Sequence, residues 1–150
     1  MEIASFIISI ISALASAVTI VVTWVLYCET VKHDKKVDTL DAFNRLQNEA
    51  LDHLYKLSAA DIKRISQNPR SDEYKQITVY LARIEHFCVG VNTGIYSVEV
   101  VKRMAGKYLV ATYKKCYPLI EKKRAISQAD KHNDEFEKTV GKINDEYHRK

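Results

Sequence analysis

Hydrophobic residues dominate the start of the chain, where the run from Ile3 to Tyr27 contains no charged side chain. A helix of this length rises about 37 Å, which is enough to cross the roughly 30 Å hydrocarbon core of a bilayer. Trp24 and Tyr27 stand near the end of the run, and aromatic side chains are typical of the membrane–water interface. We therefore expect residues 1–28 to form one transmembrane helix.

A secretory signal peptide is the alternative to a membrane span, and it fits this run poorly. The apolar core of a signal peptide is about 7–15 residues long and follows basic residues. Here the apolar run is longer, and only Met1 and Glu2 precede it. We therefore treat the run as a retained membrane span.

Basic residues follow the apolar run but do not precede it. Residues 29–36 contain Lys32, His33, Lys35 and Lys36, and no Lys or Arg stands on the N-terminal side. Segments rich in Lys and Arg tend to stay on the cytoplasmic side of a membrane. We therefore expect the N-terminus outside, residues 29–36 as a basic juxtamembrane segment, and residues 37–150 as a cytoplasmic domain.

Hydroxyl side chains inside the apolar run recur at spacings of four and three residues, within an arc of roughly 80° on a helix. A mean spacing of 3.5 is typical of a left-handed helix–helix seam with a second copy or another membrane protein. The alternative is that each hydroxyl bonds to a carbonyl of its own helix and needs no partner. The candidate interface residues are Ser5, Ser9, Ser12, Ser16, Thr19 and Thr23.

Apolar residues then recur at helical spacing from Val37 to Leu57. Asp38 or Thr39 is the candidate N-cap, so this helix either follows the apolar run after a short joint or continues from it. A capping box at residues 58–61 predicts a short helix to about residue 66, and residues 67–72 are typical of a loop.

Two longer helices are predicted in the second half of the chain. The first runs from about Glu73 to Asn92 and stops at Gly94, which can adopt a positive φ. The second runs from Val98 to about Tyr117, after a possible N-cap at residue 97. Pro118 then kinks the chain or starts a new helix, and the last segment is helical with a break near residue 127.

No segment shows the alternation of polar and apolar residues that is typical of strands. We predict an all-α fold with one N-terminal transmembrane helix and a small cytosolic domain of about four to five helices. Cys28, Cys88 and Cys116 are odd in number and widely spaced, which indicates a reducing compartment. The net charge of +4 is mild and does not by itself indicate nucleic acid.

The stretch from Leu81 to Arg124 resembles a family of short bacterial membrane-anchored proteins, domain of unknown function 4760. The resemblance implies one N-terminal membrane helix, a helical cytosolic domain and a location in the bacterial inner membrane. It implies no activity. The shared features are an Arg-x-Glu pair, two glycines, a Gly-Ile-Tyr turn, Pro-x-Ile and a closing arginine, which fall on Arg83, Glu85, Gly90, Gly94, Ile95, Tyr96, Pro118, Ile120 and Arg124.

The charged residues of this motif have two interpretations. Arg83, Glu85 and Arg124 could line a polar pocket for an anionic or small polar ligand, or they could form ion pairs that fix the register of the helices. We favour the ion pairs. A glycine at position 90, inside a helix, indicates close packing of another element rather than a ligand.

The segment from Lys102 to Arg124 contains eight basic residues and one acidic residue. Arg103, Lys107 and Lys114 fall within about 40° of one another on a helical wheel, opposite an apolar stripe. This basic face is either a solvated surface or a contact for anionic lipid or an acidic protein. Nucleic acid is unlikely because no nucleic-acid-binding motif is present.

No phosphate loop, nucleophile elbow or metal-binding motif occurs in the sequence, so we expect no enzyme, cofactor or metal site. The first hypothesis is a single-pass inner-membrane protein that acts as a tethered interaction or sensing module and self-associates through its membrane helix. The second is a membrane effector of the toxin or phage-defence type that oligomerises and permeabilises the membrane. An enzyme with an unrecognised pocket is the third.

Overall fold

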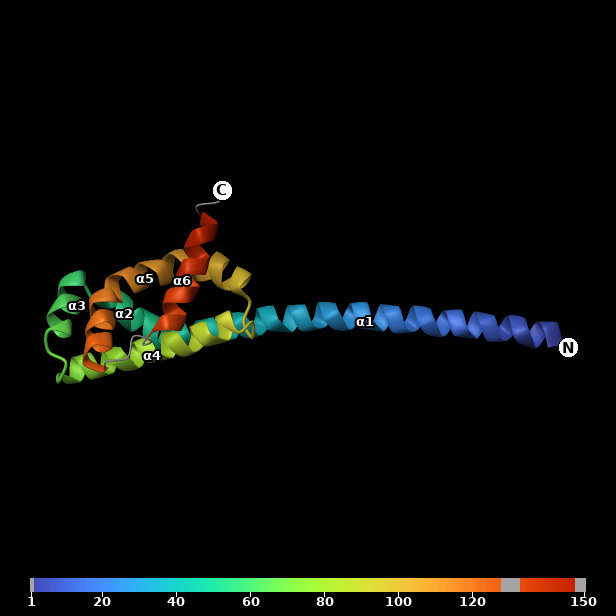
Figure 1. The fold of residues 1–150 in the computed structure, drawn as a ribbon, viewed down its shortest axis with the longest axis horizontal. Coiled ribbons are helices and arrows are strands. Elements are labelled where there is room, and N and C mark those ends of the chain that lie inside the picture. The colour runs from blue at the N-terminus through green and yellow to red at the C-terminus, as the bar shows by residue number, and fades with distance from the viewer. Residues whose placement is uncertain (1, 128–132, 148–150) are drawn as a thin grey trace. The chain divides into compact units, whose positions relative to one another are not determined.

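The computed structural model describes residues 2–127 and 133–147, apart from the side chains at positions 2, 4, 5, 146 and 147. Most of the described residues are helical, and none of them forms a strand. The chain divides into two compact units, residues 1–35 and residues 36–150. The helical elements (Figure 1) are α1 (Glu2–Leu46), the π-helical turn η1 (Gln47–Leu51), α2 (Asp52–Lys56), α3 (Ala59–Ser66), α4 (Asp72–Asn92), α5 (Val98–Ser127) and α6 (Asp134–Tyr147).

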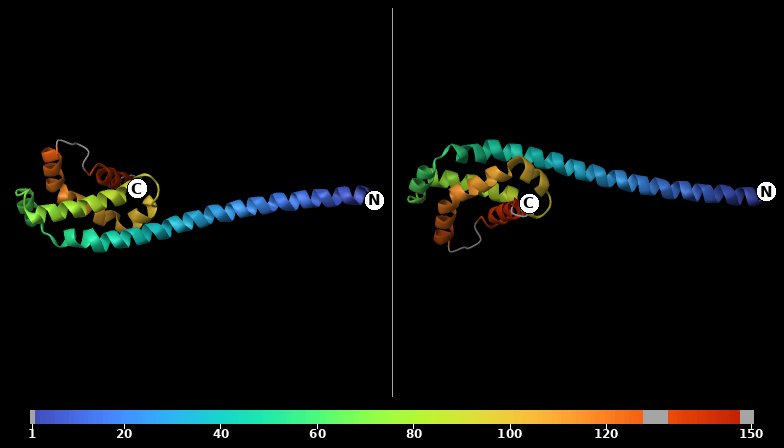
Figure 2. Two further views of the ribbon diagram at one scale, coloured as in Figure 1. Left: turned by 90° about the horizontal axis from the view of Figure 1, so that it is seen from below. Right: turned by 90° about the horizontal axis from the view of Figure 1, so that it is seen from above.

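The second unit is built around one hydrophobic core. The end of α1 and every later element contribute to it, and α6 packs against both α4 and α5 (Figure 2). The largest fully buried apolar side chains are Leu51, Leu54, Ile62, Leu81, Ile84, Leu109, Ile120, Phe136 and Ile143.

Local side-chain signals set several helix boundaries as predicted. The Ser58 hydroxyl accepts a hydrogen bond from the Asp61 N–H at 3.1 Å, and the Asp61 carboxylate accepts one from the Ser58 N–H at 3.0 Å. This capping box confirms the predicted start of α3. After the loop, the Ser71 side chain caps α4 by accepting from the N–H of Tyr74 at 3.2 Å.

The turn between α4 and α5 is also as predicted. Gly94 has a φ of 81°, a left-handed conformation that glycine adopts without steric cost. The Tyr96 N–H donates to the Gly90 carbonyl at 2.9 Å, which closes the end of α4. Ser97 then caps α5 weakly, since its hydroxyl lies 3.4 Å from the N–H of Val100.

The predicted N-cap at Asp38 or Thr39 is wrong. α1 continues through both residues to Leu46, so the helix continues from the apolar run without a joint. Thr39 is buried, and its hydroxyl accepts a hydrogen bond from the Ser97 N–H at 2.8 Å. The Thr39 hydroxyl therefore forms a tertiary hydrogen bond instead of the N-cap that the sequence pattern predicts.

The predicted helix end at about Tyr117 is also wrong. α5 runs from Val98 to Ser127 with Pro118 inside it, so the proline does not start a new helix. A proline in a helix removes one backbone donor and costs roughly 3 kcal/mol. Cys116, Leu119 and Ile120 on either side of it are buried in the core. Burial of these neighbours offsets the cost and holds the helix together across the proline.

A π-helical turn, η1, interrupts the helical ladder between α1 and α2. Such turns displace the regular pattern of backbone hydrogen bonds and occur often at functional positions. Two of its carbonyls accept hydrogen bonds from other helices. Arg83 of α4 lies 3.5 Å from the Glu49 carbonyl, and the Tyr108 hydroxyl of α5 donates to the Leu51 carbonyl at 3.2 Å.

Candidate functional site

The first functional feature is the apolar part of α1, which belongs to the first unit. By length and composition, one described helix could cross a membrane, and this part of α1 provides its apolar stretch. All described side chains from Phe6 to Tyr27 are exposed; Leu14, for example, is 62% exposed. Water is an unfavourable surrounding for so large an apolar surface.

Three of the predicted interface hydroxyls form hydrogen bonds within their own helix. Ser16 donates to the Ser12 carbonyl at 2.9 Å, Thr19 to the Ala15 carbonyl at 2.9 Å, and Thr23 to the Thr19 carbonyl at 2.8 Å. Bonds of this kind are the ones expected if the hydroxyls need no partner helix. They use the hydroxyl hydrogens and leave the oxygens able to accept from a neighbouring helix. The side chain of Ser5 lies outside the described part.

The second feature is the basic face of α5. Arg103, Lys107 and Lys114 are all exposed, while Val101, Ala105, Leu109, Thr112 and Cys116 on the opposite side are buried. Arg103 forms an ion pair with Glu99 at 2.8 Å, one helical turn earlier. Surface pairs of this kind contribute about 0.3–0.5 kcal/mol, so Arg103 remains available to an anion. The structure therefore places the predicted residues together on an open surface.

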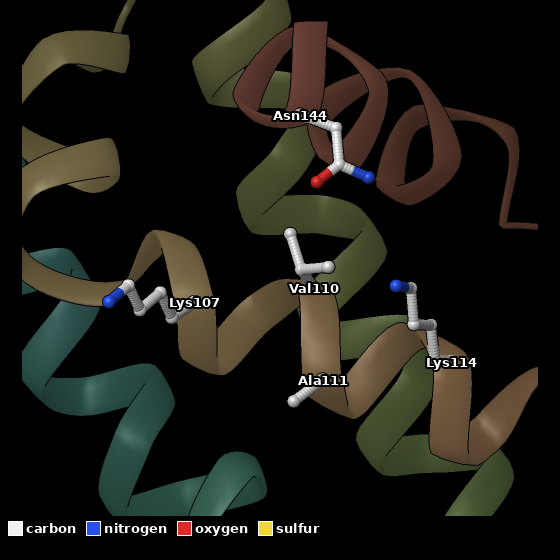
Figure 3. Close-up of a pocket in the computed structure, with 5 residues that line it drawn as sticks. All are labelled: Lys107, Val110, Ala111, Lys114 and Asn144. Atoms are coloured by element: carbon white, nitrogen blue, oxygen red, sulfur yellow. The ribbon is translucent and has the colours of Figure 1, made fainter. Parts of the chain in front are cut away.

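Lys107 and Lys114 flank a notch between α5 and α6, with a volume of about 320 Å³. Its other lining residues are Val110, Ala111 and Asn144. In Figure 3 the Lys114 side chain and the Asn144 amide point into the same space beside Val110, while the Lys107 side chain turns toward the other end of the notch. An ammonium and an amide N–H₂ can both donate hydrogen bonds to one anionic oxygen.

The third feature is a groove of about 480 Å³ between α4 and residues 42–49 of the second unit. Arg83 lies in this groove and pairs with Glu49, the Nη1–Oε2 distance being 2.7 Å. Both side chains are about half exposed, so water screens the pair. Phe87 and Tyr96 form part of the groove wall, with their rings stacked at a centroid distance of 5.2 Å.

Glu85 holds the N-terminus of α6 rather than a ligand. Its carboxylate accepts hydrogen bonds from the N–H groups of Glu135 at 3.0 Å and Phe136 at 2.8 Å. These N–H groups have no partner within their own helix, and a carboxylate also suits the positive end of the helix dipole. Asn92 of α4 adds a second link, since its amide donates to the Glu135 carbonyl at 2.9 Å.

Arg124 has its side chain 20% exposed and pairs with Glu137 of α6 at 2.7 Å. The hydrogen bond with Glu137 raises the pKa of Arg124, so the guanidinium stays charged. Burial, followed by the charge of Glu137, raises the pKa of Tyr113 to about 12. These three groups form a polar cluster that joins α5 to α6.

A family model described as a domain of unknown function (DUF4760) matches residues 6–143 of the chain. The chain belongs to this family. No match was found among curated proteins or among solved structures.

For this DUF4760 chain, each of the motif residues at positions 83, 85, 90, 94 and 124 takes part in a contact or turn that shapes the helical unit. A Cβ atom on Gly90 would lie 2.5 Å from two carbons of the Tyr96 ring, so the glycine is needed for close approach. Of the motif residues, Arg83 and Tyr96 also line the groove. The structure thus places Arg83 and Tyr96 in one groove, Gly90 against Tyr96, and Glu85 and Arg124 against α6.

Three residues of these sites were missed by sequence reasoning. Glu49 pairs with Arg83, Asn144 lines the notch and Tyr108 bonds to η1. Their partners stand 34 or more residues away in sequence or on another helix, and local spacing carries no signal for such contacts.

Proposed function

We propose that this DUF4760 chain is a single-pass protein of the bacterial inner membrane. Its apolar helix anchors a cytoplasmic helical unit, and the unit acts as a non-enzymatic interaction module. The observation that carries the proposal is the uncharged apolar surface of α1, exposed at every described side chain from Phe6 to Tyr27. Transfer of that surface from water into lipid lowers the free energy by roughly 25 cal/mol per Å² of apolar area.

The charge distribution supports the orientation. Lys32, Lys35 and Lys36 follow the apolar stretch, and the positive-inside rule then favours a cytoplasmic C-terminal unit. The exposed basic face of α5 lies in that unit, so Arg103, Lys107 and Lys114 would meet anionic lipid or an acidic protein in the cytoplasm. Lysine, arginine and asparagine side chains at this surface suit recognition of an anion.

Extraction and protease access test the anchor. The full chain with a C-terminal tag is expressed in bacteria, and its membranes are washed with alkaline carbonate. We expect the wild type in the pellet and the tag digested only in inside-out vesicles. A Leu14→Arg/Val18→Arg variant is the matched control. Each central arginine disfavours insertion by roughly 2.5–3.5 kcal/mol, so this variant should be released.

Two results would contradict the proposal. Release of the wild type by carbonate would remove the membrane anchor, and digestion of the tag in intact spheroplasts would reverse the orientation. A voltage-sensitive dye in the same cells distinguishes the module from an effector. Depolarisation that requires the intact apolar helix would favour a protein that permeabilises the membrane.

A further inference from the structure

Two large apolar side chains of α1 are uncovered within the second unit. Val37 is 41% exposed and Leu40 is 39% exposed, although neighbouring residues of the same helix, Thr39, Phe43 and Leu46, are buried. The buried residues face the core of the unit, and Val37 and Leu40 lie on another side of the helix. Asn44, one turn further on, is also exposed.

The spacing and chemistry of these residues match one side of a coiled coil. Positions 37, 40 and 44 are separated by three and then four residues, as are positions a, d and a of a heptad. A β-branched residue at a with leucine at d favours two parallel strands. An asparagine at a second a position specifies register and a two-stranded state at some cost in stability.

The flanking charges are complementary for a parallel pair. With Val37 at a and Leu40 at d, Lys36 occupies g and Asp41 occupies e, and both side chains are exposed. In a parallel two-stranded coil the g residue of one strand faces the e residue of the other. Lys36 of each copy would therefore meet Asp41 of its partner on both sides of the seam.

The same register extends upstream in the sequence. Counting back from Val37 by alternate steps of four and three residues gives His33, Thr30 and Leu26, and then the hydroxyl positions from Thr23 to Ser5. A strict seven-residue repeat of this kind is typical of a left-handed pair of helices.

We propose that a second copy of this chain packs in parallel against Val37, Leu40 and Asn44 of α1. The proposal rests on the proposed membrane function, because a shared membrane makes the two copies parallel and raises their local concentration. A seam from position 37 to position 44 covers little more than one heptad, which is too short to hold a free coiled coil together. Tethering converts the contact into one between neighbours with an effective concentration in the millimolar range. The fraction of paired chains would then rise with the density of the chain in the membrane.

Disulfide crosslinking in isolated membranes tests the proposal on the full chain. Single cysteines are introduced in a Cys28→Ser background, in which Cys88 and Cys116 stay buried. We expect Val37→Cys and Leu40→Cys to form at least five-fold more disulfide dimer under mild oxidation than Asp38→Cys and Arg45→Cys. The latter two are exposed residues on the same helix but at outward b positions.

A charge swap supplies the second measurement. In the Leu40→Cys chain, Lys36→Glu or Asp41→Lys should reduce the dimer fraction, and the double swap should restore it, because g and e then attract again. Equal crosslinking at all four cysteine positions, or no rescue by the double swap, would overturn the parallel seam. Carbonate extraction of the same membranes separates the two failures. Release of the chain from the pellet would refute the membrane anchor. A chain that stays in the pellet but does not crosslink preferentially through positions 37 and 40 would refute the seam.

Discussion

The carboxylate of Glu85 in α4 accepts a hydrogen bond from the backbone N–H of Phe136 in α6 at a distance of 2.8 Å. Two residues 51 positions apart are thereby joined at the start of a helix. Phe136 itself is fully buried, with its ring in edge contact with Tyr113 of α5 at a centroid distance of 5.2 Å. The side chain from α4 and the apolar ring of α6 together fix where α6 docks.

Removing the Glu85 carboxylate should loosen α6. Loss of an N-cap costs about 0.5–2 kcal/mol, so we expect Glu85→Ala to lower the free energy of unfolding by that amount. Urea unfolding of the full chain in neutral detergent, followed by circular dichroism, measures the change. Glu73→Ala is the matched control, because Glu73 forms only an exposed ion pair with Arg64 at 3.0 Å. Equal losses in the two variants would show that Glu85 does not cap α6.

Two of the helical glycines, Gly90 and Gly141, should respond in opposite ways to alanine. In Gly90→Ala the new methyl group would lie 2.5 Å from the Tyr96 ring, and overpacking of this kind costs about 1–3 kcal/mol. In Gly141→Ala the methyl group would meet no atom within 4 Å, so the better helix propensity should stabilise α6 by about 0.5–1 kcal/mol. Thermal unfolding of both variants beside wild type gives the comparison. A stabilised Gly90→Ala chain would contradict the close approach of the tyrosine.

The hydroxyl of Tyr108 should stabilise the π-helical turn. Tyr108→Phe removes the hydrogen bond to the Leu51 carbonyl and should cost about 0.5–1.5 kcal/mol. Hydrogen exchange of the amides at positions 47–56 should quicken in this variant. Tyr55→Phe is the control for loss of a tyrosine hydroxyl, since the Tyr55 side chain is 66% exposed. Unchanged exchange in Tyr108→Phe would show that η1 persists without this bond.

The buried thiols should make the second unit less stable in alkali. Burial raises the pKa of Cys88 from 9.0 to about 12 and that of Cys116 from 9.0 to about 11. Above pH 9 the unfolded chain releases these protons and the folded chain keeps them, so the free energy of the unfolded state falls relative to that of the folded state. Stability should therefore be full below pH 9 and fall above it, by about 1.4 kcal/mol per pH unit for each thiol.

Urea midpoints at pH 8, 9 and 10 in the presence of a reductant measure this effect. Replacing Cys116 with alanine should make the decline less steep, although the variant starts from a lower stability. Iodoacetamide offers an independent check, since neither buried thiol should react in the folded chain at pH 9. Labelling of Cys88 at a rate close to that of the unfolded chain would contradict its burial.

The sequence alone determined the features that depend on neighbours within a few residues. The uncharged run of α1, the capping box of Ser58 and Asp61, and the glycine turn at Gly94 were all predicted, because hydrogen bonds and backbone conformation there involve adjacent positions. The all-helical class followed for the same reason, since hydrophobic spacing reports the local period of the chain.

Only the tertiary structure decided what the remaining polar residues do. Thr39 bonds to Ser97 instead of capping a helix, Glu85 caps a helix far along the chain, and α5 passes through Pro118. In each case a contact or packed core outweighed a local preference of about 1–3 kcal/mol. Such contacts join residues 50 or more positions apart, and the chemistry of a side chain does not reveal its partner until the helices are packed.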